Sequence, residues 1–408
     1  MCISYQPRRP VRGVLRRIVP LVVNTISIRI ETPVKVLLVG NYPPDRQHSM
    51  LGFAALMEEG LRTAGHDVAT IYPPVVFGKL GSYVPPASKW LAYLDKFLLL
   101  PPLLKRACRD ADIVHICDHS NAVYVPEERD IPHVVTCHDL LAVRGGLGEQ
   151  TDCPATYMGA RLQAWIVSGL MRADGVACDS TATLADAARL LSERQQPPVL
   201  LPIALRGDFM PMAGTRRRGL LRTIPQLDLS KPYVLHVGSS LRRKNREGIL
   251  RIFAKLTGGL DLQLVFAGKR LESQQRKLAE ELNIQQRIIE TREISSELLV
   301  ALYGGALVFL FPSRFEGFGW PIIEAQASGC PVICTNREPL SEVAGGSALL
   351  RDLNDEDGFA ADIIRIATEK NLRADLIERG FRNVERYKPE VMISKYVSLY
   401  EQVLSNRC

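Results

Sequence analysis

The chain has 408 residues, of which 46% are hydrophobic and 23% are charged, and this balance excludes a disordered chain or a collagen-like repeat. The length favours two domains, because a single hydrophobic core of this size would be unusual. Lysine and arginine number 51 against 44 aspartate and glutamate residues. The excess suits an anionic ligand or an anionic membrane surface, and it does not by itself indicate nucleic acid.

Residues 1–31 are expected to form a poorly ordered basic arm. Basic residues precede a short apolar run from Ile18 to Val23, as they do in a secretory signal peptide. Asn24 interrupts the run, no small-residue cleavage site follows, and the run is too short to span a bilayer. The nine cysteines include no C-x-x-C pair, so we expect reduced, buried thiols and a cytoplasmic protein.

From Pro33 onward, short apolar runs alternate with segments of helical periodicity. The run Val34–Gly40 is short, rich in valine and closed by glycine, which predicts a fully buried strand. Such alternation is typical of a parallel sheet that is covered by helices on both faces. We predict a Rossmann-like domain over residues 32–205, with strands at 34–40, 68–71, 113–116, 134–137 and 175–178 and helices at 49–64 and 160–171.

The pattern lapses over residues 206–230, where glycine, proline and the basic run Arg216–Arg218 predict a surface linker. Pro389 later opens an amphipathic helix that extends to Leu404. The predicted fold class is α/β, with two Rossmann-like doubly wound domains facing each other across a ligand cleft. The second domain is predicted over residues 231–388, with strands at 233–238, 262–267, 307–311 and 332–334.

The stretch from Pro312 to Ala325 is the most informative one. A predicted strand ends at Phe311, and a loop then delivers Gly317, Phe318 and Gly319 to the start of a helix. Free backbone N–H groups at a helix start favour an anion or sugar hydroxyls. Two carboxylates, Glu316 and Glu324, can face the same cleft from this stretch. The alternative is that Glu316 caps the helix and Glu324 is solvated.

Two further clusters follow predicted strands. The segment Gly238–Asn245 is the first strand-to-helix junction of the second domain, where arginine and lysine can neutralise a diphosphate. The alternative is a charged, exposed helix start. The segment Thr136–Asp139 places His138 at the rim of the first domain. A lone histidine is more often structural, and other histidines follow strands in the same way, namely His115, His119 and His236.

Together these residues resemble the retaining, nucleotide-sugar-dependent glycosyltransferases of the GT-B fold, family four, from about Val34 to Leu404. The resemblance is strongest over Ala306–Leu350, where Glu316 and Glu324 fit the E-x7-E region of that family. It implies that Glu316 lies by the donor sugar and Glu324 by the ribose. It further implies catalytic roles for Arg243 and Lys244 at the diphosphate and for His138 near the reaction centre, with a C-terminal helix that returns to the first domain. The other donor-binding candidates are Gly317, Phe318, Gly319, Gly238 and Gly268.

One loop departs from the family pattern. Many members carry paired glycines between the first strand and helix, close to the diphosphate and acceptor. Here the loop reads Gly40-Asn41-Tyr42-Pro43-Pro44-Asp45-Arg46-Gln47-His48-Ser49. Arg46, His48 or Ser49 are therefore the candidates for contacts with phosphate or acceptor.

The resemblance implies a metal-independent hexosyltransferase in glycan, polysaccharide or glycolipid biosynthesis, with a nucleotide sugar as donor and no cofactor or metal. Asp110–Asp112 and Asp355–Asp357 are read as chance Asp-x-Asp matches. Two alternatives stay open, a nucleotide-sugar epimerase of the same fold and a non-catalytic nucleotide-sugar binding protein. Neither a dinucleotide-binding fingerprint nor a P-loop follows a predicted strand.

Membrane contact is a separate hypothesis. The segment Lys96–Arg106 and the basic arm both combine apolar and basic residues, which suits the surface of an anionic leaflet at the inner membrane face. The alternative for Lys96–Arg106 is a core or domain-rim segment. The sequence does not specify the base, the sugar or the acceptor, and nucleic acid is not needed to explain its charge.

Overall fold

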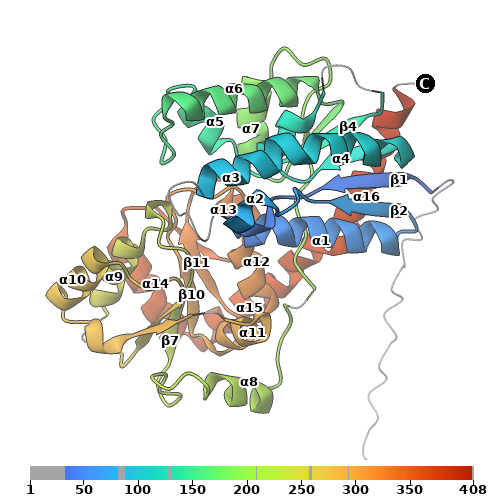
Figure 1. Ribbon diagram of the computed structural model, residues 1–408. Helices are drawn as coiled ribbons and strands as arrows, with labels where there is room; N and C mark the ends of the chain where they lie inside the picture. The colour runs from blue at the N-terminus through green and yellow to red at the C-terminus, as the bar shows by residue number, and fades with distance from the viewer. Residues whose placement is uncertain are drawn as a thin grey trace, which may run out of the picture. The chain divides into compact units, whose positions relative to one another are not determined.

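The computed structural model describes residues 33–80, 88–126, 130–207, 209–256, 260–292 and 294–406, without the side chains of residues 48, 88 and 89. The predicted basic arm lies outside the described residues. Thr32–Cys408 form one compact unit that contains two six-stranded sheets. Figure 1 shows both sheets with helices on their two faces, which confirms the predicted α/β class.

The first sheet has the strand order β2-β1-β3-β4-β5-β6, and every neighbouring pair is parallel. Its strands read as continuous apolar runs because both faces are covered. In β1, Val36 and Leu38 pack in a core with residues of α1 and α16, whereas Leu37 and Val39 pack with residues of α4 and α6 on the opposite face. The strands are β1 (Lys35–Val39), β2 (Asp67–Ile71), β3 (Ile113–Ile116), β4 (His133–Cys137), β5 (Gly175–Cys178) and β6 (Val199–Leu200).

Three helices between β2 and β3 were absent from the sequence prediction. Two prolines, Pro101 and Pro102, disturb the apolar pattern there, but they occupy the first turn of a helix, where proline is tolerated. A π-helical turn at Asp95–Leu99 also breaks the 3.6-residue period. The helices of this half are α1 (His48–Thr63), α2 (Phe77–Leu80), α3 (Ser88–Leu94), α4 (Leu100–Ala107), α5 (Leu141–Gly146), α6 (Tyr157–Arg172) and α7 (Thr181–Leu190).

The second sheet has the order β12-β11-β10-β7-β8-β9 and is also parallel throughout. Successive residues of β7 again serve opposite faces, since Val234 packs with α9 and α14 and Leu235 with α11 and α12. Two short strands, β9 and β12, were not predicted. The strands are β7 (Tyr233–Gly238), β8 (Gln263–Gly268), β9 (Ile288–Thr291), β10 (Val308–Phe311), β11 (Val332–Thr335) and β12 (Leu349–Arg351).

The segment predicted as a surface linker is more structured than its composition indicates. It contains helix α8, which carries the basic run, and three of its apolar residues, Leu221, Ile224 and Leu227, are buried in the core with Tyr233. The expectation of a purely surface connection is therefore wrong for this part. The helices of the second half are α8 (Gly214–Leu221), α9 (Arg246–Ala254), α10 (Ser273–Glu281), α11 (Ser296–Gly305), α12 (Trp320–Ala327), α13 (Leu340–Ala344), α14 (Glu356–Thr368) and α15 (Lys370–Val384).

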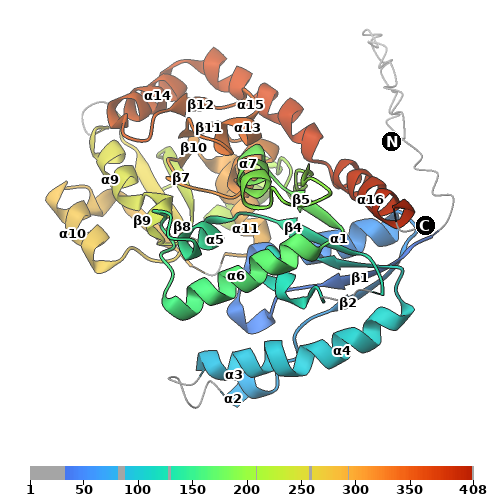
Figure 2. The same cartoon turned by 90° about the horizontal axis from the view of Figure 1, so that it is seen from above.

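Helix α16 (Pro389–Ser405) follows the second sheet in the chain but packs against the first, beside α1 (Figures 1 and 2). The hydroxyl of Tyr396 lies 2.9 Å from that of Thr136 in β4. The hydroxyl of Tyr400 lies 2.7 Å from Nδ1 of His115 in β3. These contacts tie the end of the chain to the strand ends of the first sheet. Among the described residues, no helix is both long enough and apolar enough to cross a membrane.

Candidate active site

The candidate site lies at the carboxyl ends of β7 and β10. These strands are neighbours, but β8 continues the sheet on one side of β7 and β11 continues it on the other side of β10. Ligands of open α/β sheets bind where the strand order reverses in this way. The loops that follow the two strands, residues 239–245 and 312–319, carry Arg243, Lys244 and Glu316.

Glu316 is the centre of a buried ion cluster. Its Oε1 lies 2.7 Å from Nζ of Lys244, and its Oε2 lies 2.7 Å from a guanidinium nitrogen of Arg243. Burial alone would raise the pKa of Glu316, but the two positive charges more than offset it, and the pKa lies below its ordinary value. Helix α12 is not capped by any side chain, so the alternative role of Glu316 as a cap is wrong.

Lys244 is buried and held on two sides. Its Nζ lies 4.9 Å from the centre of the Phe311 ring as well as beside Glu316. Burial lowers the pKa of Lys244, and the charge of Glu316 opposes that shift. Asn245 adopts the left-handed conformation (φ 53°) and donates from Nδ2 to the carbonyl of Pro312 at 3.1 Å. This bond ties the loop after β7 to the loop after β10.

Glycines allow the backbone segments around this cluster to approach closely. Gly319 is left-handed (φ 112°) immediately before α12 begins. A Cβ atom on Gly317 would collide with the carbonyl oxygen of His138, and one on Gly268 would lie 2.7 Å from the carbonyl oxygen of Gly238. Phe318 is buried against Tyr387, with ring centres 5.7 Å apart and nearly perpendicular, so this side chain serves packing.

Glu324 is buried in α12 with different partners. A guanidinium nitrogen of Arg206 lies 2.7 Å from its Oε1, and the hydroxyl of Tyr303 donates to its Oε2 at 3.2 Å. Burial raises the pKa of Glu324, and Arg206 only partly counteracts that effect. The alternative of a solvated Glu324 is therefore wrong. Trp320 donates from Nε1 to the carbonyl of Ala204 at 2.9 Å, which fixes α12 against the segment that leads to Arg206.

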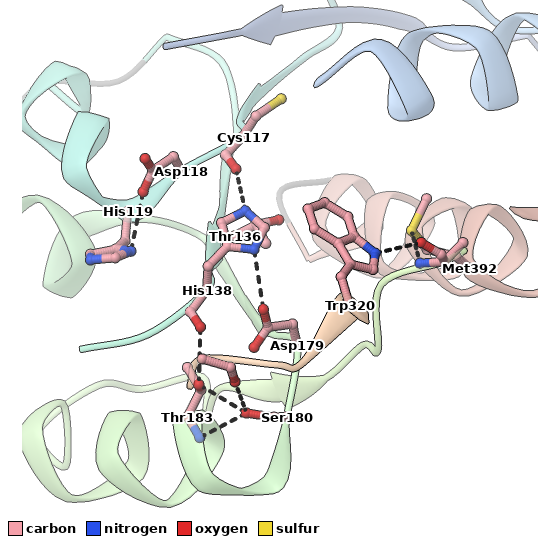
Figure 3. Close-up of polar contacts among 12 residues, drawn as sticks. Cys117, Asp118, His119, Thr136, His138, Asp179, Ser180, Thr183, Trp320 and Met392 are labelled. Carbon is pink, nitrogen blue, oxygen red and sulfur yellow. Dashed lines mark hydrogen bonds and ion pairs between the residues drawn. The ribbon is translucent and has the colours of Figure 1, made fainter. Parts of the chain in front are cut away.

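His138 follows β4 and has oxygen atoms at both ring nitrogens (Figure 3). Its Nε2 lies 2.9 Å from the carbonyl oxygen of Cys117, and its Nδ1 lies 3.2 Å from Oδ2 of Asp179. Burial alone would lower the pKa of His138, but the carboxylate of Asp179 outweighs it and the pKa is raised. Burial also raises the pKa of Asp179. A carbonyl oxygen only accepts hydrogen bonds, so Nε2 carries a proton and donates it to Cys117.

The other histidines at strand ends serve the cores. His115 lies between Tyr400 and Thr136, and His236 lies 3.1 Å from the carbonyl of Leu310. Burial lowers the pKa of both residues to about 3, so both are neutral. His119 is buried beside Asp118.

Two of the predicted residues of the β1–α1 loop, Arg46 and Ser49, are exposed. Arg46 is exposed in the left-handed conformation (φ 51°), and Ser49 is exposed in the first turn of α1. His48 begins α1, and its side chain lies outside the description. In the described part of the chain, no hydrogen bond or ion pair joins Arg46 or Ser49 to the cluster. The buried polar residue of this loop is Asn41, whose amide donates to Asp118.

A match to a known protein family covers the part of the chain that holds the cluster. Residues 218–383 match the family described as Glycosyl transferases group 1. The matched range contains Arg243, Lys244, Glu316 and Glu324. The chain is a glycosyltransferase that is similar to group 1 over these residues.

Two relatives of this glycosyltransferase are themselves named as glycosyltransferases. The O-antigen chain mannosyltransferase B of Escherichia coli is 25% identical over 333 residues, which span 75% of this chain and 82% of the relative. The 2-deoxystreptamine N-acetyl-D-glucosaminyltransferase of Niallia circulans is 28% identical over 180 residues. That match spans 42% of this chain and 46% of the relative.

Solved structures confirm the GT-B fold of this glycosyltransferase. The sucrose-phosphate synthase of Thermosynechococcus elongatus superposes with a TM-score of 0.68 at 19% identity, over 91% of this chain and 100% of that one. HepE of Anabaena, solved in complex with UDP and glucose, gives a TM-score of 0.65 at 14% identity, over 90% of this chain and 100% of that one.

Three residues at the site of this glycosyltransferase were missed in the sequence. Arg206 was assigned to a linker, and Asp179 and Ser180 were not singled out. Ser180 donates from its hydroxyl to the carbonyl of Gly317 at 2.8 Å. A carboxylate and a hydroxyl directly after a predicted strand are the available signal, since strand ends of parallel sheets share one edge. Nothing in the pattern around Arg206 points to Glu324, which is 118 residues away.

Proposed function

We propose that this glycosyltransferase moves a sugar from a nucleoside diphosphate to an acceptor hydroxyl, with retention at the anomeric carbon. The observation that carries the proposal is the ion cluster of Glu316, Lys244 and Arg243 at the β7/β10 reversal. A carboxylate kept ionised by two cations can accept hydrogen bonds from donor sugar hydroxyls. The same cations lie where a diphosphate would meet the strand ends.

In the proposed reaction, the bond between the anomeric carbon and the β-phosphate oxygen breaks, and its electron pair leaves with the phosphate. The acceptor oxygen forms the new bond on the same face of the sugar, and its proton passes to the departing phosphate. Lys244 and Arg243 stabilise the negative charge that develops on the leaving group, an effect worth about 3 kcal/mol for one preorganised donor. Glu324 accepts hydrogen bonds from the ribose, and the dyad of His138 and Asp179 lies beside Gly317 at the donor sugar.

We propose that the reaction needs no divalent metal, because two cationic side chains supply the charge that a metal ion would otherwise provide at the diphosphate. Activity that is unchanged after chelation supports this proposal. Activity that is lost on chelation and restored by Mg²⁺ or Mn²⁺ contradicts it.

A panel of nucleoside diphosphates and nucleotide sugars, read by thermal shift, identifies the donor, since a ligand that binds only the folded state raises its stability. Turnover is then followed as release of nucleoside diphosphate. Release that depends on an added acceptor supports transfer. Conversion of one nucleotide sugar into another without release indicates an epimerase, and binding without any turnover indicates a non-catalytic protein.

By analogy with the named mannosyltransferase and glucosaminyltransferase relatives, we propose a role in glycan, polysaccharide or glycolipid biosynthesis in the cytoplasm. An exposed aromatic surface supports a peripheral contact with a membrane. Trp90, Tyr93 and Trp165 are 65%, 37% and 46% exposed. Phe97 connects them, with its ring centre 5.6 Å from that of Tyr93 and 5.5 Å from that of Trp165.

The charge of this surface suits anionic lipid. Asp95 is the one acidic residue of the sequence between Ser88 and Ala107, and it is buried under the hydroxyl of Tyr42 at 2.6 Å. Lys105 and Arg106 are exposed on the same helical stretch. Sedimentation with anionic vesicles at low salt, weakened by high salt and by Trp90→Ser, supports the contact. Equal binding to neutral vesicles, or none to anionic ones, contradicts it.

A further inference from the structure

A cavity of about 660 Å³ lies between segments that follow strands of the two sheets. Its first wall comes from α5, the loop after it and α7, and its second wall comes from the loops after β7, β10, β11 and β12. Arg242 and Phe315 line it, and they directly precede Arg243 and Glu316 in the sequence. The cavity therefore adjoins the ion cluster of the candidate active site.

The arginine of the first wall is neutralised within that wall. Arg144 lies 2.7 Å from Glu149 and 3.1 Å from Asp186, and Arg189 pairs with the same two carboxylates. Asp152, the other acidic residue of this wall, lies 3.9 Å from Arg242 across the cavity. Carboxylates and neutral polar groups on this wall suit the hydroxyl groups of a saccharide.

The second wall is cationic. Arg314 donates to Oδ1 of Asn245 at 3.1 Å, and Arg337 donates to the carbonyl oxygen of Arg314 at 2.7 Å. Within the described residues, neither guanidinium has a carboxylate within 4.0 Å. Arg242 is 82% exposed and has only the distant contact with Asp152. Against these three arginines the wall contains one acid, Glu338, which accepts a hydrogen bond from Ser341.

We infer that this cavity binds the acceptor and that the acceptor is a saccharide carrying a phosphate or carboxylate group. The inference rests on the proposed function, since it assigns the acceptor side of that reaction. Arg242, Arg314 and Arg337 hold the anionic group, because guanidinium groups bind phosphate and carboxylate through paired hydrogen bonds. Phe315 offers an apolar face to a sugar ring, and the acceptor hydroxyl then reaches the donor sugar beside Glu316.

The test compares a double variant of the cavity with a matched control. In Arg242→Gln/Arg337→Gln the two exposed arginines lose their charge, while Arg314, which contacts Asn245 near Lys244, is left intact. The control, Arg218→Gln/Arg382→Gln, removes two exposed arginines from α8 and α15, away from the cavity. Both proteins are first titrated with UDP and GDP, and we expect unchanged affinity for whichever nucleotide binds.

The probes are glucose 6-phosphate, glucuronate and glucose, titrated with that nucleoside diphosphate present at saturation so that the donor phosphate site is filled. We expect the wild type and the control to bind one anionic probe more tightly than glucose. The double variant should bind it on the order of tenfold more weakly for each arginine removed. The tighter of the two anionic probes distinguishes phosphate from carboxylate.

Equal binding of glucose and both anionic probes overturns the inference, as does a double variant that binds the anionic probe as the wild type does. These results would leave the proposed function intact. Failure of every nucleoside diphosphate and nucleotide sugar to bind the wild-type protein would instead remove the proposed function itself. The two failures are therefore distinguishable.

Discussion

Glu316 and Glu324 are eight residues apart in one loop and helix, and they are 7% and 4% exposed, yet their pKa values shift in opposite directions. Burial raises the pKa of both carboxyl groups. Glu316 has two cationic partners, one of them the buried Lys244, and its pKa falls. Glu324 has one, Arg206, whose side chain is 35% exposed, and a neutral hydroxyl from Tyr303.

The number and burial of the neighbouring cations decide the protonation state of each carboxylate, since solvent weakens the attraction of an exposed guanidinium. Glu316 is a fixed negative charge at the end of β10. Glu324 gains or loses its proton closer to neutral pH. Any pH dependence of nucleotide binding is therefore expected to come from the Glu324 side of the site.

The largest effect is expected from removing the buried cation of Glu316. Lys244→Ala leaves Glu316 with Arg243 alone and removes one donor from the proposed diphosphate contact. Turnover should fall by about 10²–10³-fold, the cost of losing one preorganised donor at developing charge. Initial rates of nucleoside diphosphate release measure it. Lys255→Ala, which breaks an exposed ion pair between the end of α9 and Asp357 of α14, is the matched control and should keep wild-type rates. Equal rates in the two variants contradict the prediction.

Neutralising each carboxylate in turn should change the free energy of unfolding by different amounts. Glu316→Gln leaves Lys244 buried without its counter-charge and should lower the free energy of unfolding by about 3 kcal/mol at neutral pH. Glu324→Gln removes a carboxylate that burial already disfavours as an anion and should change it by less than about 1 kcal/mol. Urea denaturation of both variants and the wild type gives the two values.

The contributions of Glu316 and Glu324 to the free energy of unfolding should depend on pH with opposite signs. The folded-state pKa of Glu316 is lowered, so its contribution is present above the ordinary glutamate pKa and is lost as pH falls through the lowered value. The folded-state pKa of Glu324 is raised, so wild-type stability falls as pH rises from the ordinary value through the raised one. Glu324→Gln should lack that fall. If the free energy of unfolding changes with pH in the same way in the two variants, the opposite pKa shifts of Glu316 and Glu324 are contradicted.

The sequence predicted the strands of both sheets well where valine and leucine runs were long. It failed between Ile71 and Ile113, where a π-helical turn and two prolines obscured the helical period. It also missed helix α8, whose polar and basic residues show no apolar stripe, although the residues that follow it are buried. Burial there is decided by packing against the second sheet, which no local pattern encodes.

The residues of the candidate site were also predicted only in part. Glu316, Lys244 and Arg243 were predicted because each follows a strand end, and strand ends of a parallel sheet meet at one edge. That Lys244 and Arg243 bind Glu316 itself was not predicted. Arg206 was missed because its partner Glu324 is distant in sequence and is brought near only by packing between the two halves of the chain. Asp179 was missed although it and His138 follow the neighbouring strands β5 and β4, because the strand order was not known from the sequence.

A smaller effect is expected from Arg206→Gln, which removes the single ion pair of Glu324. The pKa of Glu324 should rise further, and nucleoside diphosphate affinity should fall by about fivefold, the range of a partly exposed ion pair. As the pH is lowered, nucleotide affinity should also begin to weaken at a higher pH than in the wild type, because Glu324 is protonated earlier. Isothermal titration across pH measures both. Arg216→Gln, which breaks an exposed pair with Glu297 on α11, is the control. A wild-type pH profile in Arg206→Gln contradicts the coupling to Glu324.

The smallest effect is expected from Tyr303→Phe, which removes the hydroxyl that donates to Oε2 of Glu324 at 3.2 Å and leaves the ring in place. The bond is long and its donor is neutral, so nucleotide affinity should fall only by about twofold. Tyr233→Phe is a close match, because the hydroxyl of Tyr233 is also buried and donates to the carbonyl of Leu302 at 2.7 Å, away from Glu324. Its affinity should stay at the wild-type value while its stability falls. A larger loss of affinity in Tyr303→Phe than in Arg206→Gln would reverse the comparison, because the neutral hydroxyl would then hold Glu324 more strongly than the cation does.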